Sequence, residues 1–422
     1  MLSTGNVAAA PALIERFQQV RDFSESLCSP LATEDYVVQS MPDCSPTRWH
    51  LAHVSWFFET FLLKPNVSDY VSPNPAYAYL FNSYYNAVGD KYPRPQRGLV
   101  TRPTVAEVYK YRAHVDEHVE DLLECAEPDD FARIEPIVTL GLNHEQQHQE
   151  LIVTDLKHML SHNPLHPVYV ERPSDTAASA APCEWVDFPE GVDWIGFSGE
   201  DFAFDNEMPR HRVFIHPFRL ATRPVTNGDY MEFMREGGYA RPEFWLSMGW
   251  ATVQQEGWRA PLYWEEHEGT WFQFTLSGLQ RVNPSETLAH VSYFEADAYA
   301  RWAGARLPTE GEWETAAESV GIEGNFAENG RFHPQTVSAG PGLRGIYGDV
   351  WEWTQSSYSP YPGFRTAPGA LGEYNGKFMC NQYVLRGGSC ATPRSHIRPT
   401  YRNFFPPEAR WQFSGVRLAS DA

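Results

Sequence analysis

The sequence LNHEQQHQE at residues 142–150 lies inside a run with helical character that extends from about Asp130 to about Leu160. It places His144 and His148 four residues apart. On a helix, residues at this spacing lie on one face with their Cβ atoms roughly 5–6 Å apart, so the two imidazoles can bind one metal ion. The surrounding glutamine and glutamate residues make the segment too polar for an ordinary core face. We therefore predict a metal-binding helix here, with two solvated histidines as the alternative.

The rest of the N-terminal part predicts three further helices. Their approximate ranges are 9–27, 46–63 and 104–124. A proline-rich segment, 66–103, connects the second of these helices to the third. Four helices with one long crossover indicate a four-helix bundle. On the second helix, His50 and His53 share a side because they are three residues apart.

Composition limits the partners of this chain of 422 residues. Its formal net charge is −21 and its pI is about 5.1, which disfavours nucleic acid and anionic membrane surfaces as partners. The sequence has no run of about 18 apolar residues, the length that would predict a transmembrane helix. Residues 1–11 lack the basic and apolar regions of a signal peptide. The six cysteines are scattered without C-x-x-C spacing, as is typical of a reduced, cytoplasmic protein. The oligomeric state stays open, a homo-oligomer included.

After the helical part, the residue pattern of the sequence changes. Prolines followed by serine and alanine indicate a linker at 166–182, which separates a helical domain, 1–165, from a second domain, 183–422. Short strands alternate there with turns and few helices, and the aromatic content of the chain is 14%. The expected strands are 192–197 and 211–220, and the expected helices are 227–236, 293–303 and 309–319. This pattern predicts an α+β domain with much irregular structure.

Two parts of the sequence resemble known families. His53 in the motif HLAH, with His144 and His148 in HEQQH, resembles the metal-binding bundle of DinB-like proteins. The C-terminal half resembles the formylglycine-generating-enzyme (sulfatase-modifying-factor) domain, which is related to C-type lectins. Its matching pieces are ATRPVTNGDYMEFM (221–234), ARLPTEGEWETAA (305–317), YGDVWEWT (347–354), RGGSC (386–390) and FSGVRLA (413–419). The fusion of both resembles the ergothioneine sulfoxide synthases, also called hercynine oxygenases, over nearly the whole chain.

The resemblance implies an architecture and a reaction. A DinB-like four-helix bundle would be followed by a C-type-lectin/formylglycine-generating-enzyme-like domain. His53, His144 and His148 would bind Fe(II), and the enzyme would use O2 to join the sulfur of L-cysteine, or of γ-glutamylcysteine, to the imidazole ring of hercynine, the trimethylated betaine of histidine. Three neutral imidazoles suit this chemistry, because they leave the metal its full +2 charge and up to three open positions. The product would be a sulfoxide.

One departure from the formylglycine-generating enzymes concerns copper. These enzymes bind copper through a cysteine pair after the motif RGGS. Here Cys390 follows that motif directly, and Thr392 and Ile397 stand where the pair is expected. The second domain is therefore expected to act as a scaffold and substrate wall, with Cys390 as a packed small residue.

The resemblance also implies substrate-binding residues. Arg94 and Arg97 would hold the carboxylate of the thiol substrate, because guanidinium groups bind carboxylates bidentately. Gln147 and Asn403 would bind hercynine. An ammonium head needs an aromatic cage, for which the candidates are Tyr374, Phe404 and Phe405. Because Phe405 follows Asn403-Phe404 where members that use γ-glutamylcysteine tend to carry an acid, we expect L-cysteine as the thiol.

A proton donor near the metal is also implied, since dioxygenation of the thiol competes with C–S bond formation. Many members of the family supply a tyrosine about three residues before the position of Tyr374. Here Leu371 stands at that place and cannot donate. The neighbouring Tyr84 and Tyr85, in the crossover segment, are the expected replacements, with aromatic packing as the alternative.

Two other functions remain as alternatives. HEQQH also fits the H-E-x-x-H motif of zinc metalloproteases, in which Glu145 would be the general base on a zinc-bound water. The sequence lacks the G-x-x-H continuation of the metzincins, and His53 would then have no role. The second alternative is a DinB-like metal module without catalysis, which would show no O2-dependent turnover.

Overall fold

The computed structural model describes residues 9–172 and 179–422. They form two compact units, 9–162 with 368–373 and 163–172 with 179–367 and 374–422. The predicted linker, 166–182, is part of the second unit near its start. The backbone N–H groups of Tyr169 and Val170 donate to the Leu276 carbonyl of that unit at 2.8 and 3.0 Å. Residues 173–178 of that linker and residues 1–8 of the N-terminal stretch lie outside the described residues.

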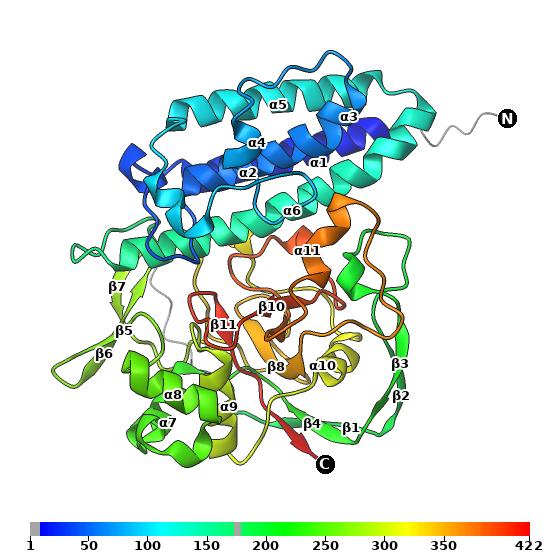
Figure 1. Ribbon diagram of the computed structural model, residues 1–422. Helices are drawn as coiled ribbons and strands as arrows, with labels where there is room; N and C mark the ends of the chain where they lie inside the picture. The colour runs from blue at the N-terminus through cyan, green and yellow to red at the C-terminus, as the bar shows by residue number, and fades with distance from the viewer. Residues whose placement is uncertain (1–8, 173–178) are drawn as a thin grey trace. The chain divides into compact units, whose positions relative to one another are not determined.

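The first unit contains the four long helices predicted from the sequence, and the bundle is confirmed. They are α1 (Ala9–Cys28), α2 (Thr47–Phe58), α5 (Val105–Cys125) and α6 (Pro128–Ser161). Both α1 and α2 pack against α5 and α6 (Figure 1). The crossover between α2 and α5 holds the short α3 (Lys64–Asn66) and α4 (Tyr77–Leu80), and a 3₁₀ helix, η3 (Arg94–Leu99).

The helix ends follow local chemistry. Thr104 caps α5, because its side chain accepts from the Glu107 backbone N–H while the Glu107 carboxylate accepts from the Thr104 N–H. Helix α6 begins at Pro128, two residues before the expected start at Asp130, since a proline in the first turn lacks only an N–H that would have no partner. No described helix combines the length and apolar composition that crossing a bilayer requires.

Helix α2 ends differently from the prediction, which placed its end at Leu63 because Pro65 follows. Five residues form a π-helical turn, η2 (Glu59–Leu63), and α3 continues to Asn66. Pro65 lies in the first turn of α3, where its missing N–H is tolerated. The π-helical turn realigns the chain, so the proline does not end the helical segment at residue 63.

Gly141 lets the two metal-site helices approach closely. A Cβ at this position would lie 2.5 Å from Cε1 and 2.7 Å from Cζ of Phe58, which belongs to α2. Any larger residue would therefore push α6 away from α2 at a point one helical turn before His144.

The second unit is built from four small sheets (Figure 1). They contain β1 (Trp185–Phe188), β4 (Phe218–Ala221) and β12 (Ala419–Asp421); β2 (Gly191–Ile195) and β3 (His211–Ile215); β5 (Trp264–His267), β6 (Thr270–Thr275) and β7 (Gly278–Arg281); and β10 (Asn403–Phe405), β9 (Tyr383–Arg386), β8 (Trp351–Ser357) and β11 (Ser414–Gly415). The predicted strand 211–220 is two strands, β3 and β4, and Pro217 between them cannot donate to a ladder.

The helices of this unit surround the sheets. They are α7 (Asn227–Arg235), α8 (Ser247–Glu256), α9 (Tyr293–Trp302), α10 (Glu310–Ala317) and the short α11 (Glu373–Gly376). Thr226, Ser292 and Thr309 cap α7, α9 and α10 with complete capping boxes, and these are the three helices expected from the sequence. Helix α8 was missed because no side chain caps it and Gly249 lies inside it.

Aromatic residues form the core of the second unit, which accounts for the aromatic content of the chain. Trp313, Trp351 and Trp353 are at most 1% exposed. A buried ion pair, Arg417 with Glu352 at 2.8 Å, lies among them, and the indole N–H of Trp313 donates to the same carboxylate at 2.7 Å. Because the charges are paired and hydrogen-bonded, the core tolerates them.

Candidate metal centre

Three histidines from two helices meet inside the first unit. His53 comes from α2, and His144 and His148 come from one face of α6. Each offers a ring nitrogen, and these three nitrogens lie within 4.8 Å of one another. The Nε2 atoms of His53 and His144 are 3.3 Å apart. These are the three residues that the sequence proposed as metal ligands.

Hydrogen bonds determine which nitrogen of two rings faces the centre. The Nδ1 of His53 lies 2.6 Å from the Phe81 carbonyl oxygen, to which it must donate, so its Nε2 carries the lone pair. The Nδ1 of His148 lies 2.8 Å from the Nδ1 of His50, which leaves the Nε2 of His148 for the centre. The arrangement therefore presents Nε2 atoms to a common point.

The environment keeps these imidazoles neutral. Burial lowers the pKa of His144 to about 4. Burial, and then the neighbouring His144, lower the pKa of His53 and of His148 well below the usual value. Neutral imidazoles are the form that binds metals. A divalent ion about 2 Å from each nitrogen requires nitrogens roughly 3 Å apart, which the separation of 3.3 Å between His53 and His144 fits.

Aromatic rings hold the ligands in place. His53 stacks on Trp49 with ring centroids 4.6 Å apart and on Trp56 at 5.4 Å. The ring of Phe57 lies 4.8 Å from that of His144. These contacts exclude water from the walls of the centre and restrict the rotation of two of the three ligands.

Arg97 lies beside this centre as a buried cation. Its guanidinium lies 3.3 Å over the Trp49 ring and donates to the hydroxyls of Ser45 and Ser83 at 2.9 and 3.1 Å. Its residue exposure is 4%, and burial followed by the nearby charge of Arg94 lowers its pKa to about 9. Within residues 9–172 and 179–422, no ion-pair partner is seen for Arg97, so it can accept an external carboxylate.

The other predicted residues of the crossover have defined surroundings. Arg94 donates to the hydroxyl of Tyr84 and to the carbonyl of Asp43. Tyr85 is buried, and its ring packs on Trp56 and Phe61.

Glu373 anchors the chain just beyond these tyrosines. Its carboxylate accepts from the backbone N–H groups of Asn86 and Ala87 at 2.9 and 2.8 Å. The same segment, 368–373, carries Leu371 and belongs to the first unit. The position where the resemblance expects a tyrosine is therefore in the same short segment as the residue that holds the Tyr84-Tyr85 loop.

Glu145 does not have the surroundings of a general base. Its Oε2 accepts from Arg21 at 2.8 Å, and its Oε1 accepts from Ser24 at 2.6 Å and from Arg112 at 2.7 Å. Burial opposes the charge, but the two arginines and the Ser24 hydroxyl outweigh it and lower the pKa of Glu145 to about 2. A fully buried carboxylate held by three donors cannot take a proton from a metal-bound water, so this geometry contradicts the metalloprotease alternative.

The remaining predicted residues have these places. Gln147 is partly exposed on α6.

In the second unit, the aromatic candidates pack on neighbouring rings. Phe404 of β10 stacks on Tyr358 with centroids 4.0 Å apart, and Phe405 packs on Trp411 at 5.7 Å. Asn403 accepts from the Phe404 backbone N–H at 2.9 Å. Tyr374 packs on Phe378 at 5.3 Å, and Phe378 lies 5.8 Å from Phe404. Their role toward a substrate stays a prediction.

Sequence reasoning missed one residue that contacts this group. Asp155 lies on α6 seven residues after His148, and its Oδ2 is 3.0 Å from the Nε2 of His50. The signal was the spacing, because residues seven apart lie on one face of a helix. From the sequence, His50 was expected to lie behind the ligands or in the core, and not to be a metal ligand itself.

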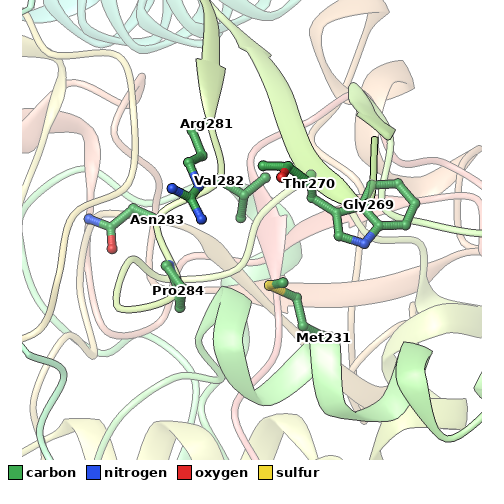
Figure 2. A pocket seen from close by; sticks show the side chains of 8 residues that line it. Met231, Gly269, Thr270, Arg281, Val282, Asn283 and Pro284 are labelled. Carbon is green, nitrogen blue, oxygen red and sulfur yellow. The ribbon is translucent and has the colours of Figure 1, made fainter. Parts of the chain in front are cut away.

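A separate pocket of about 380 Å³ lies in the second unit. Figure 2 shows Met231 of α7 on one side and Arg281 at the end of β7 on another, with Asn283 below Arg281. None of the residues that the sequence proposed for the site lines this pocket.

Comparisons with known proteins agree with both parts of the resemblance. The DinB superfamily matches residues 16–152, and the sulfatase-modifying factor enzyme 1-like domain matches 188–340 and 331–422. The chain is 32% identical to the hercynine oxygenase of Mycobacterium tuberculosis, over 90% of this chain and 92% of that protein.

Two further relatives differ in how much of the chain they match. The hercynine oxygenase of Mycolicibacterium smegmatis is 33% identical, over 91% of this chain and 92% of its own. The formylglycine-generating enzyme of Streptomyces coelicolor is 28% identical but matches only 53% of this chain. The hercynine oxygenases match about nine tenths of the chain, both domains included, and the chain is an oxygenase that belongs to the hercynine oxygenase family.

Proposed function

We propose that this enzyme is an Fe(II)- and O2-dependent sulfoxide synthase that joins the sulfur of L-cysteine to the imidazole ring of hercynine, giving hercynylcysteine sulfoxide. The reaction balances: one C–H and one S–H bond are lost, a C–S and an S–O bond form, and O2 is reduced with release of one water. The observation that carries the proposal is the group of three neutral imidazoles, because a face of three nitrogen ligands leaves room for thiolate, imidazole and O2.

When bound, iron would supply the electron transfer to O2 and a site for the thiolate. The protein supplies the remaining groups. Arg97 offers its buried charge to the carboxylate of cysteine, and Gln147 of α6, next to His148, offers an amide to hercynine. Trp49, which contacts both His53 and Arg97, keeps the metal site and the carboxylate site at a fixed spacing.

A direct assay tests this proposal. Protein loaded anaerobically with Fe(II) is mixed with hercynine, L-cysteine and O2, and the product is identified by mass spectrometry. The expected product has the combined mass of both substrates less two hydrogen atoms and plus one oxygen atom. If no O2-dependent product forms, the remaining interpretation is a metal-binding module without catalysis. Full activity with zinc in place of iron would contradict the redox role of the metal.

The enzyme is expected to prefer L-cysteine to γ-glutamylcysteine by roughly 5- to 150-fold in kcat/KM. Phe405 offers no charge to the ammonium group of the γ-glutamyl arm, and a polar group that is buried without a partner costs about 1–3 kcal/mol. Both thiols are compared at fixed hercynine concentration, and Phe405→Asp should narrow the ratio. A wild-type preference for γ-glutamylcysteine would refute cysteine as the substrate and leave the metal site unaffected.

Tyr84→Phe or Tyr85→Phe is expected to shift the product from sulfoxide toward cysteine sulfinate. One of these hydroxyls is proposed to supply the proton that directs oxygen to C–S bond formation, because Leu371 cannot. The ratio of the two products is measured at equal metal loading. Tyr79→Phe is the control, since this tyrosine lies in the same crossover but is 43% exposed. If both variants keep the wild-type ratio, neither tyrosine has this role.

Arg97→Met is expected to raise the KM for cysteine by roughly 10- to 100-fold, because hydrogen bonds to charged groups contribute about 1.5–3 kcal/mol. Steady-state kinetics at saturating hercynine measure the effect, and Arg97→Lys should be intermediate because it keeps the charge without the planar fork. Arg102→Met is the control, since Arg102 is exposed. An unchanged KM in Arg97→Met would show that the carboxylate binds elsewhere.

A further inference from the structure

A chain of hydrogen bonds extends from the metal-site ligand His148 to a carboxylate. The Nδ1 of His148 lies 2.8 Å from the Nδ1 of His50, and the Nε2 of His50 lies 3.0 Å from Oδ2 of Asp155. The backbone N–H of Ser45 donates to the same Oδ2 at 2.8 Å. His50 is 2% exposed and Asp155 is 6% exposed, so the contact between these two residues is buried.

The position of each proton in this chain follows from the role of His148. If its Nε2 lone pair is to face a metal, the proton must be on Nδ1, and Nδ1 must donate to His50. His50 then accepts at Nδ1 and carries its own proton on Nε2, where it donates to Asp155. The reverse order would place a proton on the Nε2 of His148, which would block the metal, and a lone pair of His50 against the carboxylate.

Ser45 connects this chain to the proposed carboxylate site. Its backbone N–H holds Asp155, while its hydroxyl accepts from Arg97 at 2.9 Å. Ser45 lies two residues before the start of α2, the helix that carries both His50 and His53. One residue thus contacts both the end of the hydrogen-bond chain and the buried cation.

We propose that His50 and Asp155 are positioning residues that fix the tautomer and ring orientation of His148 as an Nε2 metal ligand. This inference rests on the proposed metal site. Groups that hold a ligating histidine in this way typically change metal affinity by 10- to 100-fold when they are replaced. Neither residue needs to touch a substrate.

Co(II) is the probe for the test, because both its affinity and its visible ligand-field spectrum can be measured without turnover. His50→Phe keeps a ring of similar size but loses both contacts, so it should weaken Co(II) binding by roughly 10- to 100-fold and change the spectrum. His50→Asn places an amide oxygen near the Nδ1 position and should restore part of the affinity. Asp155→Asn should show a smaller loss than His50→Phe.

His118→Phe is the matched control, because His118 is a half-buried histidine of α5 whose ring packs on Tyr70 and whose Nδ1 lies 2.8 Å from the His114 carbonyl oxygen. It should bind Co(II) as the wild type does. Circular dichroism of the metal-free proteins checks the fold, and if His50→Phe does not fold, His50→Asn and Asp155→Asn decide. Wild-type affinity and spectrum in the folded His50 and Asp155 variants would overturn the positioning role alone. A wild-type protein that binds no Co(II) would overturn the metal site as well.

Discussion

His144→Ala is expected to abolish both metal retention and O2 consumption, and the same result is expected for His53→Ala and His148→Ala. Binding free energies of about 10–16 kcal/mol for a metal held by four protein ligands imply roughly 3 kcal/mol or more for each one. Loss of one of three ligands should therefore weaken binding by at least roughly a hundredfold. Metal content after gel filtration and O2 uptake with both substrates are the measurements.

Thermal unfolding separates loss of the metal from loss of the fold. A metal that binds only the native state raises the melting temperature of the wild type, and this increase should disappear in each variant while the metal-free proteins still unfold cooperatively. Glu117→Gln on α5 is the control, because Glu117 is exposed. A variant that retains stoichiometric iron and wild-type turnover would remove that histidine from the ligand set.

Metal retention should also depend on pH in a defined direction. The pKa of His144 is lowered to about 4, so the neutral form that binds metal dominates above that value. Protons should displace the metal only as the pH falls toward about 4, well below the usual titration range of a histidine. Release that begins near pH 6.5 would indicate that this imidazole is hydrated rather than buried.

The helical unit could be predicted from the sequence because its signals are local. Residues four apart on one helix face placed His144 beside His148. Pro65 misled the prediction for α2, because a π-helical turn takes up the change in register before the proline. A single sequence gives no sign of such a turn.

Contacts between distant segments explain what the sequence did not show. The contacts of Arg97 with Ser45 and Ser83 depend on how the crossover folds back onto α2. In the second unit, strands of two to seven residues lie in four separate sheets, so alternation of polar and apolar residues has little length in which to appear. The likeness to a family supplied the fold class there, whereas periodicity alone supplied only parts of it.

Glu145→Gln is expected to lower the free energy of unfolding of the helical unit by up to about 3–5 kcal/mol, the usual cost of removing one partner of a buried ion pair. Arg21, Ser24 and Arg112 all direct donors at this carboxylate. Arg21 also donates to Ser55, which is on α2. Removal of the negative charge would leave Arg21 with Asp116 and Arg112 with Glu25 as carboxylate partners, and would loosen the contacts that join α1, α2 and α5 to α6.

The charge state of Glu145 determines how this contribution varies with pH. Its pKa is lowered to about 2 in the folded protein, so the stabilisation is fully present above the unfolded-state pKa of about 4.3. It should be lost progressively as the pH falls from there toward about 2. The difference in stability between the wild type and Glu145→Gln should accordingly shrink over that range.

Urea unfolding at pH 7, followed by far-ultraviolet circular dichroism, measures this effect, and Glu117→Gln provides the same chemical change at an exposed site. That control should shift stability by no more than about 0.5 kcal/mol. The same pair of variants separates a structural carboxylate from a catalytic one. If Glu145→Gln kept wild-type stability but lost activity with full metal content, this glutamate would act on the reaction itself, and the structural role assigned to it here would be wrong.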